Sequence, residues 1–109
     1  MIHVTVRMVM PPRKRKETLD ILNVVAERTR VQPGCLFSRI YRDVKDENIL
    51  MVEELWNSEE GLNRHLRSED YRNVLFLMEL ALEPPEFSFR SIGLTMGVEA
   101  IEKARSCGR

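Results

Sequence analysis

Apolar and polar side chains alternate over residues 2–10, the period-two pattern of a β-strand with one buried face. Prolines at positions 11 and 12 end this strand. From residue 13 to residue 30, apolar side chains return at steps of three and four, which predicts an amphipathic helix. The helix should end at Gln32-Pro33-Gly34, because proline and glycine are typical of helix termini.

Two further strands are predicted over residues 35–43 and 48–56, joined by a polar hairpin connection. The second of them is largely apolar on both faces. One face carries Met51 and Leu55, and the other carries Val52 and Trp56. Such a strand is expected to be buried on both sides.

Two helices should follow this strand. Asn57 or Ser58 caps the first, and Asn57 with Glu60 three residues later fits a capping-box pattern. The second helical stretch starts at Ser68 and ends before the prolines at positions 84 and 85. Its predicted apolar stripe consists of Tyr71, Val74, Leu75, Met78 and Leu82.

The last predicted elements are a strand over residues 86–95 and a short helix over residues 98–106. The order strand, helix, strand, strand, helix, strand is the split β-α-β motif of ferredoxin-like α+β folds. We therefore expect one domain over residues 1–96 and a C-terminal tail over residues 97–109. Helices cover one face of such a sheet, so the second apolar face of the 48–56 strand predicts a homodimer.

Composition narrows the class of protein. With 43% hydrophobic and 31% charged residues in 109, the chain suits one folded globular domain. A formal net charge of +0 argues against nucleic acid or an anionic membrane surface as partner. No apolar run is long enough to span a bilayer, and the first residues do not form a signal peptide. Cys35 and Cys107 lie far apart, which fits a reducing cytoplasm.

Several motifs of catalytic and cofactor-binding proteins are missing. The chain has no glycine-rich nucleotide fingerprint, no phosphate-binding loop and no Gly-x-Ser-x-Gly nucleophile turn. Two histidines and two cysteines at these spacings do not suit a structural zinc site. If the protein is an enzyme, we expect it to work without a cofactor or a metal.

Residues 54–66 carry most of the candidate chemistry. This stretch contains the only tryptophan, Trp56, with Glu54 on the same strand face and His65 nine residues after the tryptophan. His65 lies on the apolar stripe of its helix, and an imidazole, with an ordinary pKa of about 6.5, is a natural general base. Tyr71, in the next helix, adds a hydroxyl group that can point inward.

Each of these residues also has a purely structural interpretation. A buried histidine can bond a backbone carbonyl, and Trp56 and Tyr71 can simply fill the core. A buried Glu54 is costly without a partner, so it either pairs with an arginine or a histidine or serves a site. The pattern by itself leaves these alternatives open.

A resemblance to a known family extends over about residues 2–95. The residues that carry it are Thr29-Arg30 before Pro33-Gly34-Cys35, Glu54-x-Trp56-x-Ser58, Leu62, His65-Leu66 and Tyr71. With them the chain resembles the antibiotic biosynthesis monooxygenase (ABM) domain family, especially its quinol-monooxygenase-like members. The resemblance implies a dimeric α+β barrel built from ferredoxin-like protomers.

The resemblance also implies an activity: oxidation of a small electron-rich aromatic molecule by O2, without flavin, haem or metal. His65 would then act as the base or a hydrogen-bond partner, Trp56 as a wall of the substrate cavity, and Glu54 and Tyr71 as orienting groups. The alternatives are a non-catalytic dimer that binds a small ligand, and an isomerase of a small carbonyl metabolite.

Two departures from relatives narrow the chemistry further. Some anthrone oxygenases of the family carry an asparagine and a tyrosine where this chain has Val52 and Leu62. Haem-degrading relatives need an asparagine in the first strand, and this strand has none. Neither specialised chemistry is therefore expected here.

Overall fold

The computed structural model describes residues 1–93 and 97–107. Its elements along the chain are β1 (Ile2–Val9), the short 3-10 turn η1 (Pro12–Lys14), α1 (Arg15–Arg30), β2 (Cys35–Arg42), β3 (Ile49–Trp56), α2 (Glu59–Leu66), α3 (Glu69–Met78), β4 (Glu86–Ser91) and α4 (Val98–Cys107). The strands form one antiparallel sheet in the order β2-β3-β1-β4. This confirms the predicted ferredoxin-like α+β fold.

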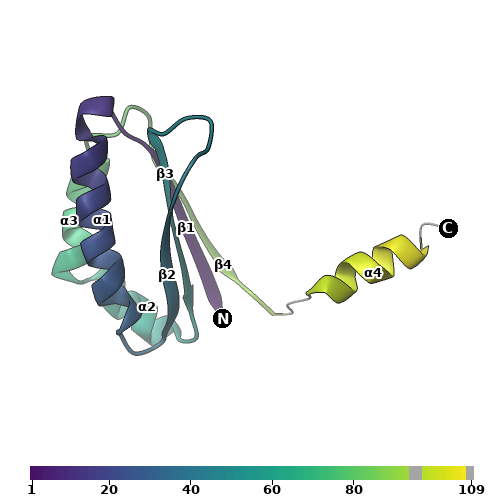
Figure 1. Ribbon diagram of the computed structural model, residues 1–109. Helices are drawn as coiled ribbons and strands as arrows, with labels where there is room; N and C mark the ends of the chain where they lie inside the picture. The colour runs from purple at the N-terminus through teal and green to yellow at the C-terminus, as the bar shows by residue number, and fades with distance from the viewer. Residues whose placement is uncertain (94–96, 108–109) are drawn as a thin grey trace.

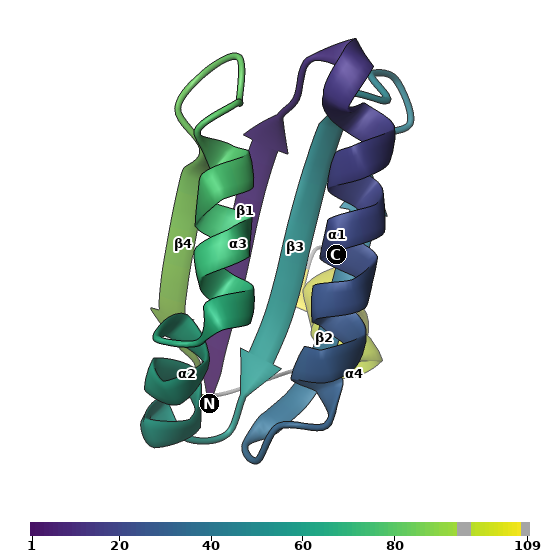
Figure 2. The ribbon, with the colours of Figure 1, turned by 90° about the vertical axis from the view of Figure 1, so that its left-hand side faces the viewer.

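Helices α1, α2 and α3 all lie against the same face of the sheet (Figures 1 and 2). The core between the two layers is built from the inward residues of β1 and β3 and the apolar stripe of α1. The sheet contributes Val4, Val6, Met8, Leu50 and Trp56, and α1 contributes Leu22 and Val25. Helix α4 stands apart from this body (Figure 1), and in the described residues no helix is both long and apolar enough to cross a membrane.

The fourth strand is shorter than the pattern predicts. It ends at Ser91, which pairs with Ile2 at the start of β1, so β4 has no neighbouring strand beyond that point. One last backbone bond, from Ile92 N–H to the carbonyl of Met1, closes the ladder at 2.8 Å. The predicted continuation through residues 94 and 95 falls outside the described residues.

Helices α2 and α3 begin close to the predicted positions, but two details differ. Ser58, not Asn57, caps α2, because its hydroxyl accepts the N–H of Gly61 at 3.0 Å. Helix α3 ends at Met78, which leaves Leu82 beyond the helix and 63% exposed. Its buried stripe is centred on Val74 and includes Leu77, so the expectation that Leu75 is buried was wrong.

The other face of the sheet is open, because no described helix covers it (Figure 1). Met51 and Leu55 lie on this face of β3, in register with Tyr41 and Phe37 of β2. A polar group sits among them: the Glu53 carboxylate contacts His3 Nε2 at 2.8 Å and accepts the Tyr41 hydroxyl at 2.9 Å. The open face is thus a mixed surface of apolar side chains around one partnered carboxylate.

Candidate functional site

Glu54 is the buried carboxylate of the helix-covered sheet face. Period-two alternation along β3 points it to the same side as Val52 and Trp56, and it is only 4% exposed. Its Oε1 atom accepts a hydrogen bond from the indole N–H of Trp56 at 3.0 Å. An inward carboxylate that accepts a donor from its own strand is held in one orientation.

His65 reaches this carboxylate from α2, whose position depends on a close approach to the β2 entry loop. Gly34 there has a φ of +92°, and its carbonyl accepts the N–H of Asn57 at 2.8 Å. A side chain at Gly61, in the first turn of α2, would lie 2.6 Å from the carbonyl oxygen of Pro33. The glycine in α2 therefore lets the helix sit close enough for His65 to face β3.

The His65 ring and the Glu54 carboxylate form a buried pair. His65 Nε2 lies 3.3 Å from Glu54 Oε2, and the two side chains are 4% and 6% exposed. The distance is that of an ion pair, but the angles are not those of a hydrogen bond, so Nε2 has no hydrogen-bond partner in the described chain. The pair therefore holds an imidazole nitrogen and a carboxylate oxygen side by side, away from water.

Two aromatic rings hold the imidazole in place. Trp56 stacks on it at a centroid distance of 5.2 Å, and Tyr71 meets it edge-on, also at 5.2 Å. Ser68, the cap of α3, joins the two helices: it donates to the His65 carbonyl at 2.7 Å and accepts the N–H of Tyr71 at 3.1 Å. The serine thus fixes the spacing between His65 and Tyr71.

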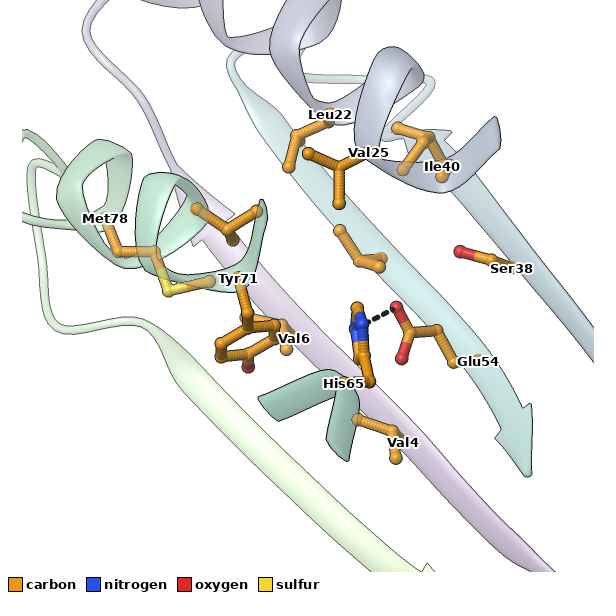
Figure 3. Close-up of a pocket in the computed structure, with 13 residues that line it drawn as sticks. Val4, Val6, Leu22, Val25, Ser38, Ile40, Glu54, His65, Tyr71 and Met78 are labelled. Carbon is orange, nitrogen blue, oxygen red and sulfur yellow. Dashed lines mark ion pairs between the residues drawn. The ribbon is translucent and has the colours of Figure 1, made fainter. Parts of the chain in front are cut away.

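A cavity lies beside this cluster, between the sheet and helices α1 and α3 (Figure 3). Glu54, His65 and Tyr71 line it, while Trp56 is fully buried behind His65 and is not one of the lining residues. The other lining side chains are Val4, Val6, Leu22, Val25, Ala26, Ser38, Ile40, Val52, Val74 and Met78. The free space is about 20 Å³, room for roughly one water molecule.

The cavity wall holds three polar atoms that lack a hydrogen-bond partner in the described chain. They are the Ser38 hydroxyl, His65 Nε2 and the Tyr71 hydroxyl. Unpaired buried polar groups are uncommon and point to a missing partner such as a ligand or water. The sequence pattern does not single out Ser38, because its place opposite Glu54 depends on the register between β2 and β3.

A second depression lies on the outer side of His65. It has a volume of about 90 Å³, and its wall consists of Arg28, Thr29, Gln32, Arg64, His65, Ser68 and Asp70. Two of these residues, Arg28 of α1 and Asp70 of α3, form an ion pair, with 2.8 Å between Arg28 Nη1 and Asp70 Oδ1. Because His65 lines both hollows, its side chain lies between this depression and the inner cavity.

Cys35 is not a nucleophile in this environment. It is half-buried at the start of β2, and its thiol contacts the carbonyl of Phe37 at 3.4 Å. Burial, with a smaller contribution from the Glu54 carboxylate, raises the pKa of this thiol to about 11. At neutral pH the group is a protonated thiol, which is a poor nucleophile.

Tyr71 provides a test of the buried environment. Burial first, and the Glu54 carboxylate second, raise the pKa of Tyr71 from 10.0 to about 12. Between pH 10 and 12 the folded protein keeps the Tyr71 proton, whereas the unfolded chain has lost it. The free energy of unfolding should therefore fall as the pH rises from 10 to 12. In a Tyr41→Phe variant, where Tyr71 is the only tyrosine, phenolate absorbance should appear near pH 12; a transition near 10 would contradict a buried hydroxyl.

The group therefore combines a buried base, an acid partner and neutral hydroxyl donors in one largely apolar hollow. Such a set can take a proton from a small molecule and hold the resulting anion away from water. Within residues 1–93 and 97–107, no three His, Cys, Asp or Glu side chains are grouped so that they could hold a metal ion.

Comparison with known proteins identifies the family. The family model described as antibiotic biosynthesis monooxygenase matches residues 1–75. The chain belongs to the antibiotic biosynthesis monooxygenase family. The match covers every strand and helix that contributes to the cavity except the last turn of α3.

Solved structures of similar proteins share the fold. A crystal structure of an antibiotic biosynthesis monooxygenase is 21% identical, with a TM-score of 0.77 over 86% of this chain and 100% of its own. The structure of Rv0793 from Mycobacterium tuberculosis is 22% identical, with a TM-score of 0.78 over 88% of this chain and 98% of its own. At these identities the likeness establishes the ABM fold and not a substrate.

One curated protein is also similar in sequence. The protein sll1783 of Synechocystis is 24% identical over 85 residues, which make up 77% of this chain and 58% of the relative. The chain thus spans somewhat more than half of that protein.

Proposed function

We propose that this ABM-family protein is a cofactor-independent monooxygenase that oxidises a small, electron-rich, quinol-like aromatic molecule with O2. The observation that carries the proposal is the buried His65–Glu54 pair on the wall of an apolar cavity, with the Ser38 and Tyr71 hydroxyls unpaired beside it. A base with a fixed acid partner, next to hydroxyl donors that lack partners, suits a substrate with an acidic hydroxyl group.

In the proposed mechanism His65 takes the proton of a phenolic hydroxyl, and Glu54 stabilises the imidazolium that forms. The Tyr71 hydroxyl donates to the phenolate oxygen, and it stays protonated because burial raises its pKa to about 12. The electron-rich anion passes one electron to O2, and the radical pair combines to a ring peroxide. For hydroquinone, loss of water then gives a hydroxyquinone: one O2 is consumed, one oxygen atom enters the ring, and the other leaves as water.

Binding requires the cavity to widen. Its present volume of about 20 Å³ accommodates a water molecule and not an aromatic ring. Met78 in its wall is an unbranched, flexible side chain. The Arg28–Asp70 bridge over the outer depression is partly exposed, and exposed ion pairs contribute only about 0–1 kcal/mol. We therefore expect the ion pair to open at small cost and Met78 to change its side-chain conformation when a ligand enters.

Oxygen uptake with a panel of hydroquinones tests the function. We expect O2 consumption above the spontaneous rate, and one labelled oxygen atom in the product when labelled dioxygen is used. Binding without uptake would instead support a non-catalytic ligand-binding module. Conversion of a small carbonyl compound without O2 would support an isomerase.

The same proposal includes a homodimer formed through the open face of the sheet. The apolar residues Met51 and Leu55 on that face require cover, and a second copy provides it most economically. The pKa of Glu53 on the same face is lowered, chiefly by the hydrogen bond to His3. A carboxylate that already has its partners is less costly to bury in an interface.

Light scattering at micromolar concentration should give twice the mass of the chain. A Leu55→Lys variant should dissociate, because it places a charge among the apolar side chains of the open face. Val24→Lys is the matched control: Val24 lies on α1 and is 47% exposed, so this variant should remain dimeric. A well-folded monomeric wild type would disprove the dimer.

A further inference from the structure

The hydroxyl of Ser38 has no evident structural purpose. Ser38 lies in β2 with its side chain against the helices, is 1% exposed, and its Oγ atom bonds to no group in the described chain. Its backbone carbonyl, by contrast, accepts the Arg30 guanidinium Nε–H at 2.8 Å. A buried hydroxyl without a partner is destabilising, so an alanine at this position would be expected to raise the stability of the fold.

Ser38 lies close to the His65–Glu54 pair. Ser38 is directly opposite Glu54 in the β2–β3 register, on the same face of the sheet. Tyr71 comes from α3, which lies over the β1–β4 side, so the two hydroxyls flank the His65–Glu54 pair (Figures 2 and 3). Between the two hydroxyls lie the His65–Glu54 pair and apolar lining residues such as Val6 and Val74.

Two unpaired hydroxyls on opposite sides of a largely apolar cavity are complementary to one kind of molecule: a ring with oxygen at two positions. One oxygen would lie at His65 and Tyr71, where the proton is removed, and the other at Ser38. We propose that Ser38 anchors this second oxygen, and that the cavity thereby selects dioxygenated over monooxygenated aromatic ligands. The inference deepens the proposed function and rests on it for the identity of the ligand as an oxygenated aromatic.

Anaerobic binding of hydroquinone and phenol tests this selection without turnover. Trp56 is the only tryptophan of the chain and stacks on His65, so its fluorescence reports ligand in the cavity. We expect wild type to bind hydroquinone more tightly than phenol. Ser38→Ala should weaken the binding of hydroquinone about tenfold, the usual contribution of one hydrogen bond. It should change the affinity for phenol by less than about twofold.

Thr18→Val provides the matched control. Thr18 is fully buried in α1, and its hydroxyl also lacks a partner in the described chain, but it is not a lining residue of the cavity. This variant should leave both affinities unchanged. In both variants the thermal midpoint without ligand should stay the same or rise, because an unpaired hydroxyl has been removed.

The outcomes separate this inference from the proposed function. If Ser38→Ala binds both ligands as wild type does, or weakens both equally, the anchoring role is wrong even if wild type consumes O2. If the variant loses only its preference for hydroquinone while no protein consumes O2, Ser38 keeps its role and the monooxygenase proposal fails. A lower thermal midpoint with unchanged affinities would assign the hydroxyl to folding and overturn the inference.

Discussion

Replacing His65 with alanine should lower the rate of hydroquinone oxidation about 10²–10⁴-fold, the usual contribution of a general base. The structure strengthens the reason: His65 is the buried imidazole at the cavity, 3.3 Å from the Glu54 carboxylate. Wild-type activity should also fall on acidification, because a protonated imidazole cannot take a second proton. Oxygen uptake over a range of pH, with each variant, measures both effects.

Two variants show whether the loss is chemical or structural. His65→Gln retains a polar side chain between the Trp56 and Tyr71 rings but provides no base, so it should be as inactive as His65→Ala and better folded. Glu54→Gln can still accept the indole N–H, so it should fold, yet lose part of the activity because the imidazolium loses its anionic partner. Unchanged turnover and pH profile in His65→Ala would make the histidine a bystander and favour the ligand-binding module.

Trp56→Ala should lower the free energy of unfolding by about 3–5 kcal/mol, as expected for truncation of a buried tryptophan. Trp56 is 0% exposed and belongs to the central core cluster, with its ring against His65. A domain of this size has only about 5–15 kcal/mol of stability in total, so the variant is close to its limit. Urea unfolding followed by circular dichroism measures the change, since the fluorescent residue is absent.

Trp56→Phe separates packing from the hydrogen bond. Phenylalanine keeps most of the buried ring but cannot donate to Glu54 Oε1, which then lacks its indole partner. We expect a cost of about 1–3 kcal/mol, the penalty for leaving a buried acceptor unpaired. Phe76→Ala, at a 53% exposed position of α3, should cost much less than Trp56→Ala. If Trp56→Ala cost no more than this control, Trp56 would not be a core residue.

Trp56 is not among the residues that line the described cavity, although the resemblance implied that it forms a wall. Trp56 was expected to face the ligand, but it lies behind His65, stacks on the imidazole and donates to Glu54. A ligand in this cavity meets Trp56 only through His65. Its proposed contribution is thus to hold the base and its acid partner, while apolar residues such as Val25 and Val74 form the wall.

Burial of the His65–Glu54 pair also has an energetic meaning. Placing a carboxylate and an imidazole in an apolar core is expensive, and such pairs rarely add net stability. Here the hydrogen bond from the Trp56 indole N–H lowers the cost of burying Glu54. His65 Nε2 and the hydroxyls of Ser38 and Tyr71 still lack hydrogen-bond partners in the described chain. An arrangement that is poor for folding but complementary to a polar ligand is typical of functional sites.

Local pattern was sufficient for the elements and for the inward direction of the main candidates. Period-two alternation in residues 2–10 and 49–56 fixes which side chains share a face, so Glu54 could be grouped with Val52 and Trp56. The helical stripe did the same for His65 and Tyr71, since three- and four-residue spacing is a property of the helix itself. It failed at Leu75 and Leu82, where the orientation and length of α3 depend on what it packs against.

Contacts between distant elements were decided only by the tertiary structure. The register of β2 against β3 places Ser38 opposite Glu54, and the approach of Gly61 to Pro33 brings α2 close enough for His65 to reach that carboxylate. Periodicity states which side of an element a residue occupies, but it contains no information on how neighbouring elements slide or stack. The pair, the role of Trp56 behind it and the unpaired hydroxyl of Ser38 all depend on those non-local distances, and therefore emerge only when the layers are assembled.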